Sequence, residues 1–534
     1  MKYDHFGVML DVSRNAVMKV DEIKKFVDLM VKAGYDSLQL YAEDIYAVKD
    51  EPFYGYLRGR YSAEEIKEID SYCREKGVEL IPCIQTLAHL TNSAKLPRFA
   101  PIIDTADILL VGEEETYKFI ERIFATLKEN FTSRKVNIGM DEAHMIGLGE
   151  YLNRHGLEDR MQILIKHLNR VVAIAEKYGF YPIMWSDMFI RLVNNGIYNT
   201  ELDEEKSKKI AEIRSGIPNV GLCYWDYYNQ DKKVYDANFN THKILTDDVW
   251  FAGGAWSWNG FAPLNDFALR TMRPAMKSVR ENGVKNVFIT MWGDDGKECS
   301  FFSLLPSLFY IRKLADGTED EQTIKEEFYK TYGISYDAML TLDLPNYCNG
   351  YPKGKFQCPS KVMLYNDCFA GMWDPVVEKE GVIDYSSHVE KLKSARKEAK
   401  EFSYLFDSAI SLCKALQLKY DLGVRTRKAY KSGDKKQLKK LSCEYFETAK
   451  RVKKFTDDFR TLWFKENKAF GWEIQEIRLG GLKARIEECG SRLKNYASGR
   501  LDRIDELEEE VIALSPEQDL QYNVYRRLVS PSEL

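Results

Sequence analysis

The sequence predicts an α/β protein: a (β/α)8 barrel of the TIM type with a C-terminal all-helical domain. Over roughly the first 320 residues, eight short runs of β-forming residues alternate with amphipathic stretches of helical period. No G-x-G-x-x-G follows the first run, which disfavours the alternative of a doubly wound open sheet. From Val376 to Ser515 the chain has no proline and is rich in Lys, Glu and Leu, as is typical of a helical bundle.

The predicted strands are short apolar runs that alternate with the predicted helices. They are Phe6–Leu10, Ser37–Tyr41, Glu79–Ile84, Lys135–Met140, Tyr181–Trp185, Val220–Trp225, Val249–Trp256 and Val287–Trp292. The helices expected between them carry apolar residues at helical spacing. They are Asp21–Ala33, Ala63–Lys76, Glu114–Asn130, Met161–Tyr178, Glu204–Ser215, Asn265–Glu281 and Ser303–Leu314. Alternation of this kind favours a parallel sheet covered by helices.

The chain of 534 residues is too long for one compact core, so more than one domain is expected. We expect a catalytic barrel over residues 1–320, an irregular bridge over 321–375 and a helical domain over 376–534. The most loop-like piece of the bridge is the run GYPKGKFQCP at residues 350–359. Within the helical domain, apolar residues recur at helical spacing from Phe402 onwards.

Charge, hydropathy and cysteine usage limit the partners and the compartment. The net charge is −5, from 77 basic and 82 acidic side chains, so the chain offers no basic field for nucleic acid or an anionic membrane. No stretch approaches the roughly 18 apolar residues of a membrane helix, and we expect the N-terminus to form the first strand rather than a signal peptide. The ten cysteines are scattered without a CxxC pair, which favours reduced thiols and a cytoplasmic protein.

Active sites of TIM barrels lie at the C-terminal ends of the strands, so the residues there are the functional candidates. Arg14 follows the first strand, where its guanidinium could bind two sugar hydroxyls or pair with an acid at the barrel mouth. Glu43 and Asp44 follow the second strand and either line the pocket or anchor a loop. His89 follows the third strand, and a lone histidine in such a place is more often structural than catalytic.

The fourth strand ends in two adjacent carboxylates, Asp141 and Glu142. Side chains of a regular strand alternate between faces, so both can reach the barrel axis only if the chain leaves β geometry at Asp141 or Glu142. Two carboxylates in different environments can divide a task, one held protonated as a general acid and the other ionised. The alternatives are that Asp141 caps the next helix, or that Asp141, Glu142 and His144 bind a metal, although no further ligand cluster has metal-like spacing.

Aromatic residues end the last four strands, and acidic residues follow three of them. One tryptophan at a strand end usually belongs to the core, but four consecutive strands with this ending are harder to assign to packing. An aromatic cage with carboxylates at its rim suits one pyranose ring, because aromatic walls hold its faces while carboxylates accept its hydroxyls. The residues are Trp185 with Asp187, Tyr224 to Tyr228, Trp256 with Trp258, and Trp292 with Asp294 and Asp295.

In their order along the barrel, these residues resemble those of glycoside hydrolase family 20, the β-N-acetylhexosaminidases. Asp11 and Arg14 resemble the first-strand Asp and the sugar-binding Arg of the family, and His89 resembles its third-strand His. The run Gly-Met-Asp-Glu that ends in Asp141 and Glu142 resembles its catalytic Asp-Glu pair. The resemblance covers the whole barrel.

The later strands extend the resemblance to the sugar-binding residues. Trp185, Trp256 and Trp292 resemble the pocket tryptophans, and Asp294 stands where the family often has a Glu that contacts O4 and O6. Because the first strand starts within about ten residues, we expect no counterpart of the usual N-terminal α+β domain, and the helical extension is unlike that of the common secreted members. The chain therefore looks closest to a compact subgroup of bacterial exo-enzymes. The candidates for the tyrosine that holds the acetamido oxygen are Tyr224 and Tyr227.

The resemblance implies an exo-acting hydrolase that removes a terminal non-reducing GlcNAc or GalNAc from an oligosaccharide or glycoconjugate. The implied mechanism is retaining and substrate-assisted, one of the exceptions to retention by two protein carboxylates. The 2-acetamido oxygen of the substrate attacks C1, while Glu142 acts first as general acid and then as general base. Asp141 orients the acetamido N–H and balances the positive charge of the intermediate. No cofactor and no metal are expected.

Two alternatives remain open. A retaining glycosidase with a protein nucleophile would use a carboxylate facing Glu142, such as Glu43 or Asp44, and would cleave sugars that lack the acetamide. A non-catalytic sugar-binding barrel would need no acid at the scissile oxygen, so the pair Asp141 and Glu142 argues against it.

Overall fold

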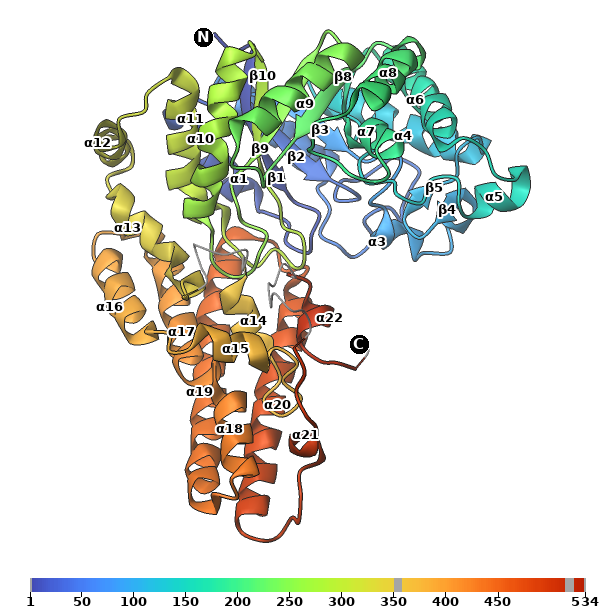
Figure 1. The fold of residues 1–534 in the computed structure, drawn as a ribbon. Helices are drawn as coiled ribbons and strands as arrows, with labels where there is room; N and C mark the ends of the chain where they lie inside the picture. The colour runs from blue at the N-terminus through green and yellow to red at the C-terminus, as the bar shows by residue number, and fades with distance from the viewer. Residues whose placement is uncertain (1, 350–357, 514–522, 533–534) are drawn as a thin grey trace.

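The computed structural model describes residues 2–349, 358–513 and 523–532. The upper part of the molecule in Figure 1 is a barrel surrounded by helices, and the lower part is a bundle of long helices. The fold class predicted from the sequence is therefore confirmed. The run at 350–359, which we expected to form a loop, lies outside the described residues except for Cys358 and Pro359.

Eight parallel strands close the barrel in the order β1-β10-β9-β8-β7-β6-β3-β2. Each strand predicted from the sequence is present, and β1 pairs with β10 from His5 opposite Asn286 to Leu10 opposite Met291. Because all neighbours run parallel, the eight C-terminal strand ends meet at one rim. The strands are β1 (His5–Asp11), β2 (Ser37–Ala42), β3 (Glu79–Ile84), β6 (Lys135–Asn137), β7 (Tyr181–Trp185), β8 (Gly221–Trp225), β9 (Val249–Gly254) and β10 (Asn286–Met291).

Side chains of the strands alternate between the barrel interior and the layer beneath the helices. In β1, Met9 lies inside the barrel with Tyr41 and Trp185, whereas Val8 and Leu10 belong to the core between strands and helices. The interior is thus a packed apolar core that supports the rim from below.

Eight helices cover the outside of the barrel, and the sequence predicts seven of them. It misses α9, whose buried face includes Asn238, Thr241 and His242, so that the apolar period is weak there. The covering helices are α1 (Val20–Ala33), α2 (Ala63–Glu75), α4 (Glu114–Asn130), α6 (Arg160–Lys177), α8 (Glu204–Ile213), α9 (Lys232–Leu245), α10 (Asn265–Glu281) and α11 (Leu305–Asp316). Shorter elements in the connections are α3 (Thr91–Ala94), η1 (Ala100–Ile102), β4 (Ile103–Thr105), β5 (Ile108–Leu109), α5 (Glu150–His155), α7 (Asp187–Val193), η2 (Arg214–Gly216) and η3 (Phe301–Leu304).

Short helices occupy residues 321–375, where the sequence led us to expect an irregular bridge. The reason is visible in α14, which buries Ser360 and Lys361 completely and so lacks an amphipathic pattern. The elements that begin in this range are α12 (Glu321–Tyr332), α13 (Tyr336–Leu340), η4 (Thr341–Asn346), α14 (Pro359–Tyr365) and α15 (Asp374–Glu380).

The helical domain is built around two long helices, α19 and α20, which extend away from the barrel (Figure 1). Apolar side chains of both helices belong to the same continuous core as the helix layer of the barrel. The helices of this domain are α16 (Tyr385–Arg396), η5 (Lys400–Phe402), α17 (Ser403–Lys419), α18 (Leu422–Lys431), α19 (Lys435–Glu466), α20 (Trp472–Ala497), α21 (Asp505–Glu508) and α22 (Tyr525–Leu528).

The turn between α19 and α20 rests against the loop that follows β1. Backbone hydrogen bonds join Lys19 N to Glu466 O (2.9 Å) and Lys468 N to Val17 O (2.8 Å). The same loop carries Arg14, so the helical domain helps to fix one of the predicted site residues.

Gly471, in this turn, offers a test of that contact. Its φ is +85°, and a Cβ there would lie 2.3 Å from the carbonyl oxygen of Asn15. Gly471→Ala should therefore cost more than the roughly 1–2 kcal/mol of a left-handed L-residue, because the Asn15 backbone must also move. Urea unfolding measures the cost, and Gly499→Ala is the matched control, since Gly499 has φ +76° and nothing within 4 Å of an added Cβ. Equal losses of stability in the two variants would contradict the prediction.

Candidate active site

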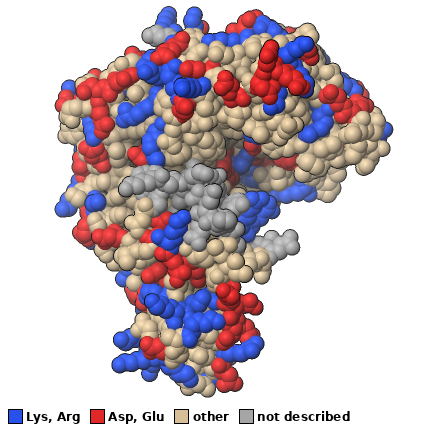
Figure 2. Space-filling model, in the orientation of Figure 1, with Lys and Arg blue, Asp and Glu red and all other residues tan. Residues whose placement is uncertain are grey.

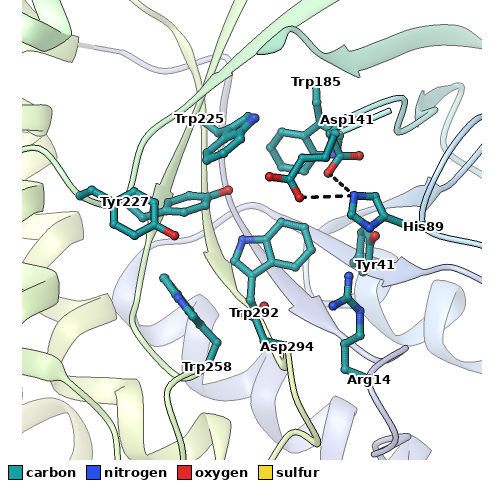
Figure 3. A pocket seen from close by; sticks show the side chains of 12 residues that line it. Arg14, Tyr41, His89, Asp141, Trp185, Trp225, Tyr227, Trp258, Trp292 and Asp294 are labelled. Carbon is teal, nitrogen blue, oxygen red and sulfur yellow. Dashed lines mark ion pairs between the residues drawn. The ribbon is translucent and has the colours of Figure 1, made fainter. Parts of the chain in front are cut away.

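A pocket of about 260 Å³ opens at the C-terminal rim of the barrel (Figure 3). This volume is below the roughly 300–1,000 Å³ of sites for drug-sized ligands, and it suits one small ring. The ends of all eight barrel strands, or the loops that follow them, contribute to the lining. The lining residues are Arg14, Tyr41, His89, Asp141, Glu142, Trp185, Trp225, Tyr227, Tyr228, Trp258, Trp292 and Asp294.

The fourth barrel strand, β6, ends earlier than the sequence predicts, at Asn137 instead of Met140. Beyond it the backbone turns through left-handed conformations at Gly139 (φ +76°), Met140 (φ +72°) and Glu142 (φ +51°). We expected the departure from β geometry at Asp141 or Glu142, and it begins before them. The turn is what allows adjacent carboxylates to line the same pocket.

Gln85, at the end of β3, holds this turn from one side. Its side-chain oxygen accepts a hydrogen bond from Met140 N (3.2 Å), and its amide nitrogen donates to the carboxylate of Asp141 (2.7 Å). Gly139 leaves the space for it, because a Cβ there would lie 2.1 Å from the Gln85 side-chain oxygen. One amide therefore fixes both the backbone and the first carboxylate.

Asp141 is buried and paired with a cation. Its side chain is 11% exposed, and its carboxylate lies 3.2 Å from His89 Nε2. Burial alone would raise the pKa of Asp141, but the charge of His89 and the hydrogen bond from Gln85 outweigh it and lower the pKa below its usual value. Burial alone would likewise lower the pKa of His89, and the Asp141 carboxylate raises that pKa to about 9. At neutral pH the pair is an imidazolium beside a carboxylate.

Glu142 differs from Asp141 in both exposure and partners. Its side chain is 40% exposed, and its carboxylate lies 3.8 Å from His89 Nε2 and 3.8 Å from the guanidinium of Arg191. The dashed lines in Figure 3 join His89 to both carboxylates. A carboxyl group that is exposed to the pocket and lies farther from its cationic neighbours can exchange a proton with a bound ligand.

Asp187, at the start of α7, supports Glu142 from behind. It accepts a hydrogen bond from Glu142 N (3.2 Å) and pairs with Arg191 Nε (3.0 Å). Burial and the neighbouring Asp141 and Glu142 raise the pKa of Asp187 to about 7, although Arg191 opposes them. Asp187, held by Arg191, thus fixes the backbone of Glu142, the third left-handed residue of this turn.

Arg14 lies on the opposite wall and is held by a carboxylate that does not line the pocket. Its Nε donates to Glu43 (2.9 Å), which is buried. Asp44 is also buried and accepts a hydrogen bond from Arg58 Nε (3.0 Å). Glu43 and Asp44 thus serve as anchors, and the remaining guanidinium nitrogens of Arg14 face the pocket (Figure 3).

The aromatic wall differs in part from the one that the sequence predicts. Trp185, Tyr227 and Trp292 line the pocket as expected, but Tyr224 and Trp256 do not. Four further residues line the pocket, namely Tyr41, Trp225, Tyr228 and Trp258. The sequence placed the last three among the strand-end aromatics without assigning them a contact with the sugar, and it gave Tyr41 no role.

Strand alternation explains the position of Tyr224. Cys223 and Trp225 face the barrel interior, so Tyr224 between them points into the helix layer, where its hydroxyl donates to Asp226 (2.9 Å). The same parity would have identified Trp225, and likewise Tyr41 in β2, as pocket residues. Tyr227 is thus the remaining candidate of the two predicted tyrosines.

Trp256 lies behind the pocket wall. It stacks on Trp258 with ring centroids 4.3 Å apart, and its indole nitrogen donates to Tyr227 O (2.9 Å). Both tryptophans follow the end of β9, where strand parity no longer applies, so the sequence cannot tell which of them reaches the ligand. Trp258 forms the wall and Trp256 supports it.

Asp294, in the loop after β10, completes the rim opposite the turn that carries Asp141 and Glu142. Its backbone has a φ of +27°, and the preceding residue, Gly293, donates its N–H to Asp11 (2.8 Å). Burial raises the pKa of Asp294 to about 6, although Arg14 and a hydrogen bond from Asn523 oppose the rise. Arg14 and Asp294 place a forked donor and an acceptor on the same side, which is an arrangement for sugar hydroxyls.

Figure 2 shows Lys and Arg interspersed with Asp and Glu over the visible face, with a hollow between the barrel and the helical domain. Among the residues that the structure describes, no helix combines the length and apolar character needed to cross a membrane. Within the same part of the chain, no group of three or more His, Cys, Asp or Glu side chains is arranged to hold a metal ion.

Two family models match the chain. Residues 46–243 match the glycosyl hydrolase family 20 catalytic domain, and residues 337–525 match the Glycoside Hydrolase 20C C-terminal domain. Together they span more than two thirds of the chain.

Individual proteins match over part of the chain. A beta-hexosaminidase of Akkermansia muciniphila is 24% identical over 269 residues, which make up 42% of this chain and 54% of that protein. Hexosaminidase D of Bos taurus is 26% identical over 266 residues, or 47% of this chain and 69% of that protein. The chain spans about half the length of the first curated relatives it matches. A mutant Streptomyces plicatus beta-hexosaminidase in complex with the product GlcNAc is 17% identical with a TM-score of 0.45, covering 62% of this chain and 69% of that one.

The pairing of His89 with Asp141 predicts a measurable shift. Asp141→Asn removes the charge that opposes burial, so the pKa of His89 should fall from about 9 to below its usual value near 6.5. An NMR titration of the imidazole signals measures this shift. The internal controls are His167 and His242, whose pKa burial lowers to about 4 and whose partners lie elsewhere. An unchanged pKa of His89 in the variant would contradict the pairing.

The same pair affects stability in a defined pH window. The raised pKa of His89 stabilises the fold fully below about pH 6.5, and this contribution is lost as the pH rises through about 9. The lowered pKa of Asp141 contributes above about pH 3.9, and that part is lost in more acidic solution. Urea unfolding should therefore show a larger loss of stability for Asp141→Asn near pH 5.5 than above pH 9.

Proposed function

The chain belongs to glycoside hydrolase family 20, and from this premise we propose that it is an exo-acting β-N-acetylhexosaminidase. It would remove a terminal non-reducing GlcNAc or GalNAc from an oligosaccharide or glycoconjugate. The observation that carries the proposal is the adjacent pair Asp141 and Glu142, held in different environments at the wall of a pocket for one ring.

The mechanism that we propose is retaining and substrate-assisted. The 2-acetamido oxygen attacks C1 while Glu142 protonates the departing glycosidic oxygen, so that the C1–O bond breaks and an oxazolinium forms. Glu142 then removes a proton from the attacking water, which opens the oxazolinium at C1 and restores the acid. Asp141 accepts the acetamido N–H and balances the positive charge that develops on the ring.

The environments of the two carboxylates suit these roles. Gln85 and His89 favour the ionised form of Asp141, as a charge-balancing group requires. Glu142 is more exposed to the pocket, as a group that serves first the leaving oxygen and then water must be. Tyr227, with its hydroxyl in the pocket wall, is our candidate for the donor to the acetamido oxygen.

A protein nucleophile has less support. Glu43 and Asp44 were the candidates, and both are buried outside the pocket lining, where Glu43 pairs with Arg14 and Asp44 with Arg58. The substrate is therefore the better source of the nucleophile.

Exo-action follows from the size of the pocket. The aromatic residues, with Trp292 and Trp258 among them, enclose a space for one ring, and Glu142 is the more exposed of the two adjacent carboxylates. We propose that the ring enters by its non-reducing end, with Arg14 and Asp294 binding its hydroxyls. Products would then be single sugars.

A reducing compartment is also part of the proposal. All ten cysteines are free, and eight of them are buried. This supports the cytoplasmic location expected from the sequence. A bacterial subgroup stays a prediction, because relatives of similar identity come from bacteria, a plant and mammals.

The acid role of Glu142 predicts a dependence on the leaving group. Glu142→Gln should lower kcat by on the order of 10²–10⁴ for substrates with poor leaving groups, and by much less for activated aryl glycosides, which need little protonation. Steady-state kinetics with both kinds of glycoside measure the difference. Glu129→Gln, at an exposed position on α4, is the control and should behave as the wild type. Equal losses with both kinds of substrate would show that Glu142 is not the acid.

Replacement of the substrate acetamide tests the proposed function most directly. If the substrate supplies the nucleophile, a glycoside with hydroxyl in place of the 2-acetamido group should be almost inert, whereas its N-acetyl counterpart is hydrolysed. A thiazoline mimic of the oxazolinium should inhibit strongly, because it resembles the bound high-energy species. A covalent adduct with a 2-fluoro sugar, located by peptide mass spectrometry on any carboxylate, would replace this mechanism by double displacement through the protein. Failure to hydrolyse any N-acetylhexosaminide would remove the proposal altogether.

A further inference from the structure

The loop after β10, which carries Trp292 and Asp294 into the pocket, is held by groups of α14 and of the helical domain. Trp292 and Asp294 both line the pocket, yet Asp294 and Lys297 have positive φ values of +27° and +50°. Strained loops of this kind keep one conformation only where their surroundings over-determine it. Here part of those surroundings comes from beyond the barrel.

Three hydrogen-bond donors from the later part of the chain contact Asp295, the residue after Asp294. Lys361, which is fully buried, lies 3.1 Å from the Asp295 carboxylate and 2.8 Å from Glu298. Arg478 on α20 donates to Asp295 Oδ1 (2.9 Å) and to its carbonyl oxygen (3.0 Å). Tyr525 N donates to Asp295 Oδ2 (2.6 Å). Asp295 is thereby fixed by α14 and by two separate segments of the helical domain, α20 and α22.

Asn523, two residues before Tyr525, reaches the pocket lining itself. Its side-chain amide donates to Asp294 Oδ2 (3.1 Å) and to Trp258 O (3.0 Å). Trp258 and Asp294 belong to the loops after β9 and β10, and both line the pocket. One amide therefore bridges two neighbouring walls, and it does so from a segment some 230 residues further along the chain.

We propose that Asn523 is a positioning residue for sugar binding. It holds the Asp294 carboxylate against Trp258, so that the other carboxylate oxygen accepts a hydrogen bond from a hydroxyl of the terminal sugar. The helical domain is on this view a part of the substrate site. The anchors at Asp295 hold the loop in place, and Asn523 sets the direction of the one carboxylate in it that meets the ligand. This inference rests on the proposed function, since it assigns a sugar hydroxyl to Asp294.

Asp294 needs a hydrogen-bond donor from outside the barrel if its carboxylate is to keep one orientation. Arg14 attracts this carboxylate from one side, and no hydrogen bond of Asp294 within the barrel fixes the rotation of its side chain among the described contacts. A donor at Oδ2 leaves Oδ1 with a defined direction, and the bond to Trp258 O fixes the donor in turn. Hydrogen bonds to charged groups are stronger than neutral ones, so the loss of this one should be measurable.

A double-mutant cycle on Asn523 and Asp294 tests the proposal. Asn523→Ala should lower kcat/KM for an aryl N-acetylhexosaminide on the order of 10-fold, mainly through KM. Asn523→Asp, which keeps the shape but replaces the donor by a like charge, should lower it further. In the Asp294→Ala background, Asn523→Ala should change kcat/KM by less than about twofold, because the group through which it acts is gone.

A panel of monodeoxy substrates adds a readout that a merely structural role would not move. If a monodeoxy substrate lacks the hydroxyl that Asp294 binds, the Asp294→Ala variant should turn it over as well as the wild type does. This comparison identifies the hydroxyl. Asn523→Ala should lose its effect on the same deoxy substrate and keep it on the others. Asn495→Ala, at an exposed position near the far end of α20, is the control for substitutions in this domain.

The outcomes separate this inference from the proposed function. Suppose that the wild type hydrolyses N-acetylhexosaminides. If the Asn523 variants then have the same kcat/KM as the wild type, or if they lose as much kcat/KM in the Asp294→Ala background, the positioning role is overturned while the proposed function stands. Thermal unfolding identifies a variant that fails only because it is less stable. If the wild type shows no turnover, the cycle is read from the affinity for GlcNAc by calorimetry, and the absence of both turnover and binding overturns the two proposals together.

Discussion

The site depends on the point at which the fourth barrel strand stops being a strand. If β6 continued past Asn137 with regular geometry, Asp141 and Glu142 would face opposite sides and only one could reach the pocket. Left-handed residues turn the chain instead, and such residues persist only where neighbours hold them. Gln85 accepts a backbone N–H of this turn and donates to Asp141, so the group that stabilises the strained backbone also favours the ionised carboxylate.

The charges around the turn give the two carboxylates different chemistry. His89 lies closer to Asp141 than to Glu142, and Asp141 is the more buried of the two, so the strongest attraction falls on the group that the proposed mechanism keeps ionised. Glu142 faces the opening with looser cationic neighbours, and Asp187 holds its backbone without occupying the pocket. A protonatable group beside a permanent anion is what separate roles in acid catalysis and charge balance require. Both roles come from adjacent positions because the backbone turns between them.

The sequence predicts most of the fold and much of the site, and the failures have identifiable causes. All eight strands follow from apolar runs, whereas α9 is missed because it buries polar side chains. Tyr224 could have been excluded by its parity with Trp225, but Trp256 and Trp258 lie past the end of β9, where parity carries no information. The contact between Asn523 and Asp294 could not be predicted at all, because nothing local relates residues so far apart in the chain.

The two sides of the pocket are therefore supported in different ways. The turn that carries Asp141 and Glu142 is held by neighbouring barrel segments through Gln85 and Asp187, so the proposed reacting groups depend on the closed barrel itself. The opposite side, which carries Arg14 and Asp294, consists of loops, and loops keep a fixed geometry only when something outside them packs against them. The turn before α20 meets the first of these loops, and Asn523 meets the second. On the proposed function, the helical domain acts on the sugar-binding side and leaves the catalytic side to the barrel, so substitutions in the domain should alter ligand affinity and preserve the chemistry at Asp141 and Glu142.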